Sequence, residues 1–359
     1  MDRIFYLDHA PIDFHFRPTP ETFVVEEVPL YPFSGEGEHL ILKVRKKNMT
    51  TWQMLQTLSE QVGVKVRDIG YAGLKDKNAL TYQYISINKK YEESLARFSH
   101  PSIKIVETTR HKNKIRLGHL KGNRFFIRLK KVTPLNAKKI DEVIKIIAEE
   151  GMPNYFGYQR FGIDGENYRL GQEIVEGKRQ VRDKKLRRLY INAYQSHLFN
   201  LWLSKRVENS KLLKSFSYKE LGDIFDLPQG LLKELKEQPR FFKIYPGDIM
   251  MHYPAGKIFY AEDVPAEAER FFQKSIAPTG LLPGKGVKRS DGLARGIEKD
   301  FDDERIQEFG DRRYAWVFVE DLQGKYKEKE AWYELNFFLP KGSYATVLLE
   351  EIAHRKLKE

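Results

Sequence analysis

The pattern of hydrophobic and polar residues changes character twice along the chain. In the first part, short segments of alternating polarity, typical of strands, are interspersed with segments whose apolar residues recur every three or four positions, typical of helices. Beyond Gly165 the pattern becomes mostly helical, with glycine and proline breaks, and strand character returns near Tyr314. We therefore predict an α+β protein in which residues 176–311 form a domain inserted into a domain made of 1–175 and 312–359.

Two helices are predicted in the first part of the chain. One spans Thr51–Val62, with Thr51 as its N-cap, and the other spans Leu135–Glu150 and ends at Gly151. The first helix places its large apolar residues on one face, namely Trp52, Leu55, Leu58 and Val62. Strands are predicted at Leu40–Arg45, Asp68–Ala72, Thr81–Ile87, Ile103–Thr108 and Asn123–Leu129.

The remainder of the chain is predicted to be helical in its middle and mixed at its end. The predicted helices are Glu166–Lys178, Arg182–Arg206, Gly230–Glu237 and Pro265–Ser275. Two strands, Tyr314–Val319 and Ala331–Leu339, and a final helix from about Tyr344 to His354 complete the pattern. No internal repeat or low-complexity segment interrupts it.

Composition narrows the class of function. The chain has 359 residues, 62 Lys and Arg against 50 Asp and Glu, a net charge of +12 and 13% aromatic residues, which favours a polyanionic partner such as nucleic acid. It lacks a long apolar run and the apolar core of a signal peptide, so we expect no membrane association. It contains no cysteine, which excludes disulfides and thiolate chemistry and favours the cytoplasm. The nine histidines form no metal-binding pattern, so no metal is expected.

The basic residues are concentrated in two segments. Lys104–Lys130 has nine Lys or Arg against one acid, Glu107, and Lys178–Arg188 has seven against Asp183 alone. Such runs are often solvated faces, but their one-sidedness and the aromatic residues among them favour phosphate contacts. The residues predicted to contact RNA from these segments are Arg110, Lys112, Lys114, Arg116, Lys121, Arg124, Lys184, Lys185, Arg187 and Arg188.

One acidic residue stands out in the segment Tyr71–Tyr82, which reads YAGLKDKNALTY. Asp76 lies between Lys75 and Lys77 at a predicted turn between two strands. Positive charge nearby favours the ionised carboxylate, so Asp76 could act as a nucleophile or a base at neutral pH. From spacing alone, an ordinary solvated turn aspartate remains the alternative.

A second segment combines groups that suit a flipped nucleotide. Pro153–Gly162, PNYFGYQRFG, carries four aromatic rings, two amides and an arginine. Rings can stack on an extruded base, Asn154 can hydrogen-bond a base edge, and Arg160 can hold a phosphate. The alternative is a tight loop whose rings fill a domain junction.

Two other motifs carry no chemistry. GLLPGK at residues 280–285 has three residues between its glycines where a phosphate-binding loop has four. Ser196 and His197 are adjacent on a predicted helix, so their side chains diverge by about 100° and cannot pair as nucleophile and base. We therefore expect no nucleotide cofactor.

Several segments together resemble the TruD family, the tRNA pseudouridine synthases D. YAGLKDKNALTYQ, PNYFGYQRFG and the C-terminal LPKGSYATVLLEEI carry the resemblance, and YINAYQSHLFN is similar to a family helix that reads A-Y-Q-S followed by F-N. Phe23, Val25 and Glu27 match the family pattern F-x-V-x-E, although Thr22 stands where an aspartate is usual. The matches run from residue 23 to beyond residue 350, so the resemblance covers nearly the whole chain.

The resemblance implies a fold and a set of site residues. The implied fold is the pseudouridine synthase catalytic domain, a mixed and largely antiparallel sheet with flanking helices, into which an α/β TRUD domain is inserted. Asp76 matches the catalytic aspartate and Lys75 the lysine before it. Phe23, Asn154 and Phe156 match residues that line the uridine pocket, and Tyr344 stands where the family places a Phe or Tyr.

The resemblance also implies a reaction and a partner. Uridine is isomerised to pseudouridine, usually at position 13 of certain tRNAs, and this requires no cofactor, because nothing is oxidised and no group moves between molecules. We expect a monomer with tRNA as partner and no obligate protein partner. Two other classes stay open, namely a basic RNA-binding protein without catalysis, acting on tRNA or ribosome assembly, and a hydrolase of the glycosidic bond.

Overall fold

The computed structural model describes residues 3–357, and these divide into two compact units. The first unit comprises residues 3–11, Glu149–Phe318 and Ser343–Lys356. The second comprises Ile12–Ala148 and Val319–Gly342. Each unit therefore contains segments that are far apart in the sequence.

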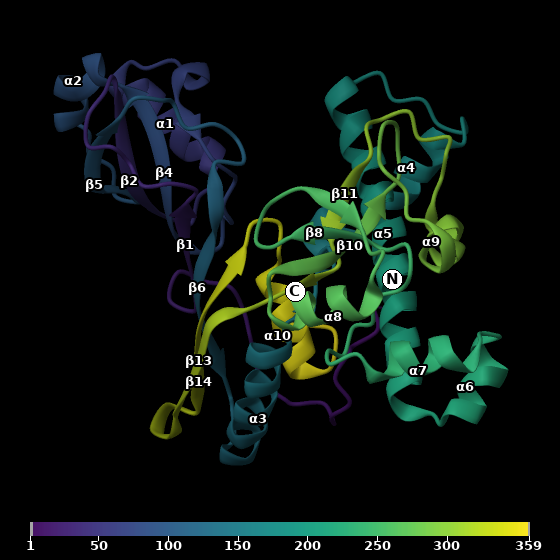
Figure 1. The fold of residues 1–359 in the computed structure, drawn as a ribbon. Helices are drawn as coiled ribbons and strands as arrows, with labels where there is room; N and C mark the ends of the chain where they lie inside the picture. The colour runs from purple at the N-terminus through teal and green to yellow at the C-terminus, as the bar shows by residue number, and fades with distance from the viewer. Residues whose placement is uncertain (1–2, 358–359) are drawn as a thin grey trace. The chain divides into compact units, whose positions relative to one another are not determined.

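The second unit is built on an eight-stranded sheet with the order β13-β14-β6-β1-β4-β2-β5, to which β3 adds by pairing with β4 (Figure 1). The pairing is antiparallel throughout except between β1 and β4, which run parallel, so the sheet is mixed. Its strands are β1 (Phe23–Pro29), β2 (His39–Lys47), β3 (Gly70–Tyr71), β4 (Leu80–Asn88), β5 (Ile103–His111), β6 (Leu120–Lys130), β13 (Glu320–Lys327) and β14 (Trp332–Pro340).

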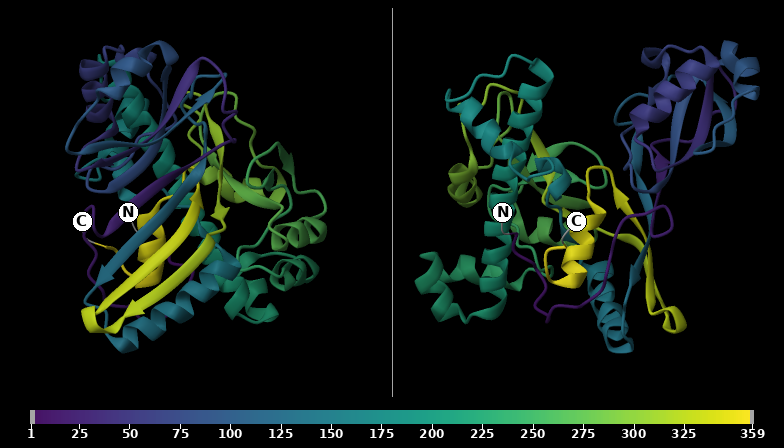
Figure 2. Two further views of the ribbon diagram at one scale, coloured as in Figure 1. Left: turned by 90° about the vertical axis from the view of Figure 1, so that its left-hand side faces the viewer. Right: turned by 180° about the vertical axis from the view of Figure 1, so that it is seen from behind.

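Three helices accompany this sheet, α1 (Thr51–Val62), α2 (Glu92–Ala96) and α3 (Pro134–Glu150). Helix α1 buries Met54, Leu55 and Leu58 against inward-facing apolar residues of β2 and β4, which form one core cluster. Helix α3 runs beside the long strands β6 and β14 (Figure 2), and Tyr333 of β14 hydrogen-bonds to Asp141 of this helix. Because alternate residues of a strand point to opposite faces, one face of the sheet is apolar and carries both long helices.

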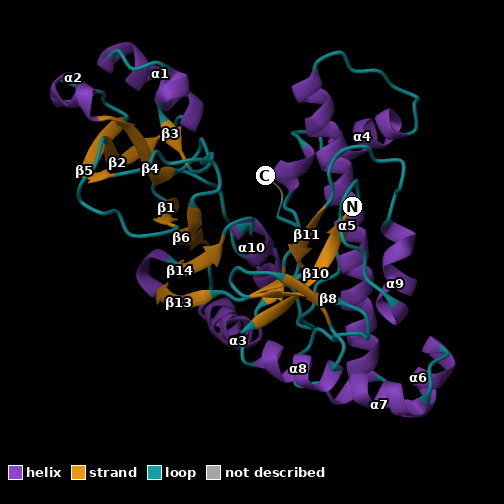
Figure 3. Ribbon diagram, turned by 45° about the horizontal axis from the view of Figure 1, so that its top comes forward, coloured by secondary structure: helices purple, strands orange, loops and turns teal. Residues whose placement is uncertain are grey.

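The first unit is organised around one long helix, α5 (Lys184–Ser215), which spans 32 residues beside a four-stranded sheet with the order β11-β10-β8-β9 (Figure 3). Asp183 caps this helix by accepting hydrogen bonds from Lys185 and Leu186. The four-stranded sheet consists of β8 (Ile249–His252), β9 (Ile258–Tyr260), β10 (Ile276–Leu282) and β11 (Asp311–Tyr314). A separate pair of strands in this unit is formed by β7 (Met152–Pro153) and β12 (Trp316–Val317). The other helices are α4 (Asn167–Val175), α6 (Tyr218–Phe225), α7 (Gln229–Glu237), α8 (Val264–Phe272), α9 (Gly292–Glu298) and α10 (Ala345–Ala353).

The predicted α+β class is confirmed, and so are the limits of the helix at Thr51–Val62. Its predicted cap and face were partly wrong. Thr50 caps the helix in a reciprocal arrangement with Gln53, Thr51 is buried as its first residue, and Trp52 is 51% exposed. Met54 is buried where Trp52 was predicted to be, because the buried face of the helix consists of Thr51, Met54, Leu55, Leu58 and Val62.

Other boundaries also moved. The helix predicted to end at Arg206 continues to Ser215, and the strand predicted at Tyr314–Val319 is two short strands, β11 and β12, in different sheets. Strand β10 was missed because its seven residues, IAPTGLL, are nearly all buried and contain proline and glycine, so they show no alternation. The limits 176 and 311 of an inserted domain stay a prediction. Both residues lie within the first unit, and the two units are defined by which residues pack together, so their boundaries do not test these limits.

Among the described helices, none is both long enough and apolar enough to span a membrane.

Candidate active site

Asp76 lies in the loop between β3 and β4 of the second unit, and its side chain is half-buried. The loop is attached to the start of α1. Thr51 accepts a hydrogen bond from the backbone N–H of Lys75 (2.9 Å) and donates its own hydroxyl to Gln83 of β4 (3.0 Å). Thr51 and Gln83 are fully buried, so these bonds are shielded from water. The sequence around Asp76 is therefore held by the sheet and the helix on either side of it.

A buried lysine makes the second attachment. The ammonium group of Lys46, at the end of β2, donates to the backbone carbonyls of Met49 (2.8 Å) and Asp76 (2.9 Å), and lies 3.5 Å from that of Lys75. Lys46 is completely buried. Burial lowers the pKa of its amine to about 8, while the charge of Asp76 acts in the opposite direction. Lys46 thus ties the Asp76 loop to the segment that leads into α1.

Lys75 and Glu27 form a buried ion pair beside this loop. Lys75 Nζ lies 2.6 Å from Glu27 Oε2, and both side chains are at most 5% exposed. Burial raises the pKa of the Glu27 carboxyl, and the charge of Lys75 opposes that shift. The other oxygen of Glu27 accepts a hydrogen bond from the backbone of Tyr84 (3.3 Å). The carboxylate that Lys75 contacts is therefore Glu27 of β1, so this ion pair joins the F-x-V-x-E segment to the Asp76 loop.

Phe23 lies at the start of β1 in a row of aromatic rings. Its ring is stacked with Phe125 of β6 at 6.1 Å, Phe125 is stacked with Phe337 of β14 at 5.2 Å, and Phe16 meets Phe23 edge to face at 5.9 Å. Phe23 is only 7% exposed, so most of its ring is already packed. The pairs extend across three neighbouring strands, which fixes the ring's orientation.

The first unit contains a second group of predicted residues, beginning with Asn154 after β7. The Asn154 carboxamide donates to the backbone carbonyl of Tyr314 (3.0 Å), and its oxygen accepts from the guanidinium of Arg313 (2.9 Å). Arg313 also donates to the backbone carbonyl of Asn154 at 3.0 and 3.2 Å. The Tyr314 carbonyl can only accept and the Arg313 guanidinium can only donate, so these two partners fix the orientation of the Asn154 amide.

Phe156 is packed from three sides. The carboxamide of Asn200, on α5, bonds to both the backbone N–H (2.8 Å) and the carbonyl (3.0 Å) of Phe156. The guanidinium of Arg313 lies 3.9 Å from the centre of the Phe156 ring, and Phe199 meets the ring edge to face at 5.6 Å. Burial lowers the pKa of Arg313 to about 10, opposed by the nearby Tyr344 hydroxyl. The guanidinium is still charged at neutral pH and contributes cation–π stabilisation to the ring.

Tyr344 reaches the same place from the residue before α10. Its ring lies 6.2 Å from that of Phe156, nearly edge to face. A side chain at Gly157 would put its Cβ 2.8 Å from the Tyr344 ring, so this glycine allows the close approach of the two segments. Three predicted residues, Asn154, Phe156 and Tyr344, are thus brought together in the first unit.

Arg160 adjoins this group but is already engaged. Its Nε donates to the hydroxyl of Ser196 on α5 (2.9 Å), and its guanidinium lies 5.4 Å from the centre of the Phe156 ring. Burial lowers its pKa. Its predicted role as a phosphate contact stays a prediction.

The predicted RNA-contacting residues lie at the surface, and several form ion pairs. Arg110 pairs with Glu92, Lys112 with Glu36, Arg124 with Asp321 and Arg187 with Glu308, and Lys114 donates to the backbone carbonyl of Arg67. The pairs of Arg110, Lys112 and Arg124 are exposed on both sides, and such pairs contribute little stability, so they can exchange for contacts with phosphate. Those with exposed side chains and no such pair described include Arg116, Lys121, Lys184, Lys185 and Arg188.

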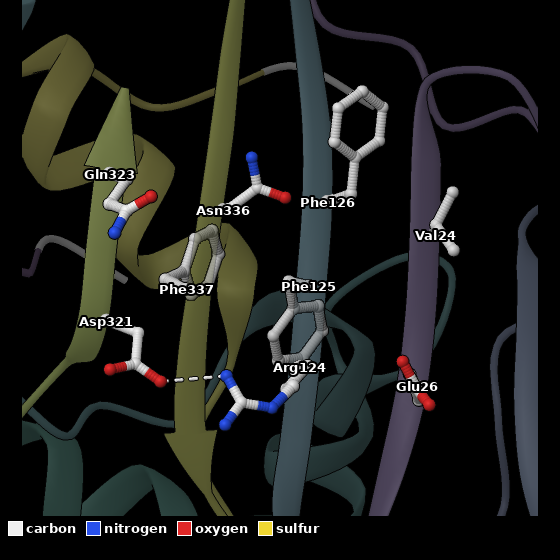
Figure 4. A pocket seen from close by; sticks show the side chains of 9 residues that line it. All are labelled: Val24, Glu26, Arg124, Phe125, Phe126, Asp321, Gln323, Asn336 and Phe337. Carbon is white, nitrogen blue, oxygen red and sulfur yellow. Dashed lines mark hydrogen bonds and ion pairs between the residues drawn. The ribbon is translucent and has the colours of Figure 1, made fainter. Parts of the chain in front are cut away.

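Arg124 also borders a hollow of about 380 Å³ on the sheet of the second unit (Figure 4). Two carboxylates, Glu26 and Asp321, lie at its edge, and Asp321 holds the Arg124 guanidinium at 2.8 Å. These acids make the hollow a poor site for an anion. The full lining is Val24, Glu26, Arg124, Phe125, Phe126, Asp321, Gln323, Asn336 and Phe337.

Two residues of these groups were not singled out from sequence. Lys46 belongs to a strand that ends in a run of basic residues, and Arg313 to an adjacent arginine pair, so neither has a distinctive local pattern. Among residues 3–357, no group of three or more His, Asp or Glu side chains is arranged to hold a metal ion.

Comparison with known proteins identifies the family. Residues 2–181 and 179–352 match the family model described as tRNA pseudouridine synthase D (TruD). A protein of Nitratiruptor sp. named tRNA pseudouridine synthase D is 76% identical to this chain, over 100% of this chain and 99% of that protein. A protein of the same name from Wolinella succinogenes is 56% identical to this chain, with the same coverage. The crystal structure of a Methanosarcina mazei protein named for the same family aligns with a TM-score of 0.73 at 21% identity, covering 98% of this chain and 96% of that one, and so shows the shared fold. The chain therefore belongs to the TruD family of tRNA pseudouridine synthases.

Proposed function

We propose that this protein converts uridine to pseudouridine in tRNA, at position 13, with Asp76 as the catalytic residue. The isomerase activity follows from membership of the TruD family. The observation that supports Asp76 is the way its loop is held, with Thr51 and Lys46 bonded to the backbone of Lys75 and Asp76. Preorganised placement of a reacting group is worth orders of magnitude in rate, because small displacements are costly.

The reaction breaks the N1–C1′ bond, turns the uracil and joins C5 to C1′. The C5 hydrogen is lost to solvent as a proton, and N1 takes up a proton in its place. Asp76 can take part by attacking C1′, by adding to C6 of the ring or by removing the 2′ proton. Each route uses the Asp76 carboxylate, and the buried ammonium of Lys46 holds the backbone carbonyl of the same residue. The Lys75–Glu27 pair supports the loop from the β1 side.

Asn154, Phe156 and Tyr344 are proposed to bind the extruded uridine. A carboxamide has two N–H groups, and Asn154 directs one at Tyr314 and its oxygen at Arg313, so the other N–H can donate to a uracil oxygen. Phe156 and Tyr344 provide aromatic surface, and stacking contributes roughly 1–3 kcal/mol per base. That is comparable with the few kcal/mol needed to flip a nucleotide out of its stack. Phe23 of β1 is proposed as a further uridine-binding residue.

The basic residues of Lys104–Lys130 and Lys178–Arg188, with Arg160, are proposed to contact tRNA phosphates. Since the reaction is an isomerisation within one nucleotide, it calls for no cofactor. We further propose that the protein acts in the cytoplasm, a reducing compartment that suits a chain without cysteine. We also propose that it acts as a monomer.

The test is the Asp76→Asn substitution assayed on tRNA from cells that lack this protein. Pseudouridine is mapped by a carbodiimide-dependent stop of reverse transcription, binding is measured in parallel, and the nucleosides are examined for free uracil. We expect wild type to create one new stop at position 13 without releasing uracil, and Asp76→Asn to bind tRNA but create no stop.

Three results would contradict the proposal. Free uracil from the wild-type reaction would indicate a glycosidic hydrolase. Binding without a stop would leave an RNA-binding protein. Loss of tRNA binding in Asp76→Asn would show that the aspartate is structural.

A further inference from the structure

The first unit presents a short projection made of residues 283–286 and 308–310, which we call the Phe309 projection. Lys285 donates its backbone N–H to Glu308 (2.9 Å), Gly310 donates to Lys285 (3.0 Å), and Lys285 and Phe309 pair as an isolated parallel bridge. A Cβ at Gly284 would lie 2.4 Å from the carbonyl oxygen of Glu308, so only a glycine lets the two segments approach this closely. Gly284 and Lys285 of the GLLPGK motif therefore belong to this projection.

The projection exposes an aromatic ring to solvent. Phe309 is 87% exposed, against 38% for Phe216 and 48% for Phe272, the other strongly exposed phenylalanines among the described residues. Single exposed apolar side chains are common on protein surfaces. This one differs because the backbone on both sides of the ring is hydrogen-bonded, so the ring is presented in a defined place at little further entropic cost.

Helix α5 holds the projection and places cations around it. The amide of Gln195 donates to the carbonyls of Pro283 (2.6 Å) and Phe309 (3.2 Å), and Arg187 forms an ion pair with Glu308. Arg188 precedes Gln195 by seven residues, two helical turns, so it lies on the same side of the helix. Arg188 and Lys285 are both exposed.

We propose that Phe309 stacks on an unpaired, unstacked base of the tRNA, while Lys285 and Arg188 contact the phosphates on either side of it. An aromatic face between cations is the surface by which proteins bind single-stranded and looped RNA. Positive charge around the ring favours RNA over a protein partner, because an apolar protein contact would not be improved by unpaired cations. The proposal rests on tRNA being the substrate, and it assigns the Phe309 projection and Arg188 a part in binding.

The experiment measures the Kd of unmodified tRNA transcripts by fluorescence anisotropy at several salt concentrations. Phe309→Leu removes the ring but keeps an apolar side chain of similar size, and Phe309→Trp keeps a stacking ring. Phe216→Leu is the matched control, because Phe216 is an exposed phenylalanine that follows the other end of α5. Lys285→Gln tests the phosphate contact, and a fully paired RNA duplex serves as a probe without unstacked bases.

For Phe309→Leu we expect the Kd for tRNA to rise roughly 5- to 100-fold with an unchanged salt slope, and the Kd for the duplex to stay within about twofold. Phe309→Trp and Phe216→Leu should stay near wild type, and Lys285→Gln should reduce the salt slope by about one. An unchanged Kd for Phe309→Leu would overturn the proposal, as would an equal loss on the duplex. A shift in oligomeric state with unchanged tRNA binding would also overturn it and indicate a protein contact. Pseudouridine formation by wild type is measured on the same tRNA, so failure of the proposed function is seen separately.

Discussion

A substitution of Lys46 tests whether the hydrogen bonds that hold the Asp76 loop are needed for catalysis. Replacing this lysine with methionine keeps the buried aliphatic volume and removes the ammonium that bonds to the carbonyls of Met49 and Asp76. Loss of the ammonium from these two carbonyls costs about 1–3 kcal/mol each. Against this, burial has lowered the Lys46 pKa from 10.5 to about 8, so the charged amine costs ~3 kcal/mol at neutral pH, and the variant regains this.

These terms largely cancel, so we expect Lys46→Met to fold, with a stability between about 1 kcal/mol above and about 3 kcal/mol below that of wild type. The loop, however, loses its attachment to the residues before α1. Because a displacement of about 1 Å can cost roughly 100-fold in rate, kcat should fall by about 10- to 100-fold while the KM for tRNA stays within about twofold. The assay is tritium release from tRNA containing 5-tritiated uridine, since the C5 hydrogen is lost when C5 joins C1′.

The control is Lys43→Met on the same strand. Lys43 is three residues from Lys46, hence on the opposite face of the sheet, and pairs with Glu26 and Glu107 at 2.9 and 3.3 Å. We expect this variant to retain kcat.

The absence of cysteine from the chain allows the amine to be restored chemically. In Lys46→Cys, the single thiol can be alkylated with bromoethylamine in the unfolded state, which rebuilds a side chain of nearly the same length with a terminal ammonium. Refolded protein should recover most of the lost kcat, whereas the unalkylated variant should not. An unchanged kcat in Lys46→Met, or a folded alkylated protein without recovery, would refute the reasoning.

Stability should show the same lysine in its pH dependence. The folded-state pKa lies below the unfolded one, so the native state binds fewer protons between about pH 8 and 10.5. Wild-type stability should therefore rise with pH across this window by up to ~3 kcal/mol relative to Lys46→Met, as measured by denaturant unfolding.

Two further predictions concern other parts of the chain. Burial raises the pKa of Glu351 from 4.5 to about 8, so the native state holds an extra proton between these pH values and its stability should fall as the pH rises through them. Glu351→Gln should remove most of this pH dependence, as measured by thermal unfolding at several pH values. A variant whose stability depends on pH as strongly as that of wild type would contradict the prediction. Neutralising the exposed Arg116 and Lys121 together to glutamine should weaken tRNA binding at low salt and reduce the slope of log Kd against log salt by about two, and an unchanged slope would exclude phosphate contacts there.

The sequence alone was sufficient for features that depend on neighbouring residues. The apolar spacing of residues 51–62 was enough to predict helix α1 with its observed limits. The turn at Asp76 follows from polar residues between two strands. The motifs around Asp76, Asn154 and Tyr344 were enough to indicate the family, because each is a contiguous run of residues.

The tertiary structure decided what those residues touch. Lys75 follows a pattern that suggests a cation beside Asp76, yet its ammonium pairs with Glu27, 48 positions away in the sequence. Lys46 reads as the basic end of a strand, but it is buried because carbonyls from residues 49 and 76 converge on it.

Arg312 and Arg313 show the same limit within a single dipeptide. Alternation along β11 sends them to opposite faces, so Arg312 pairs with Glu298 while Arg313 lies against Phe156 and orients Asn154. A local pattern specifies where a strand or helix forms, but the burial of a charge depends on partners that only chain folding brings within hydrogen-bonding distance.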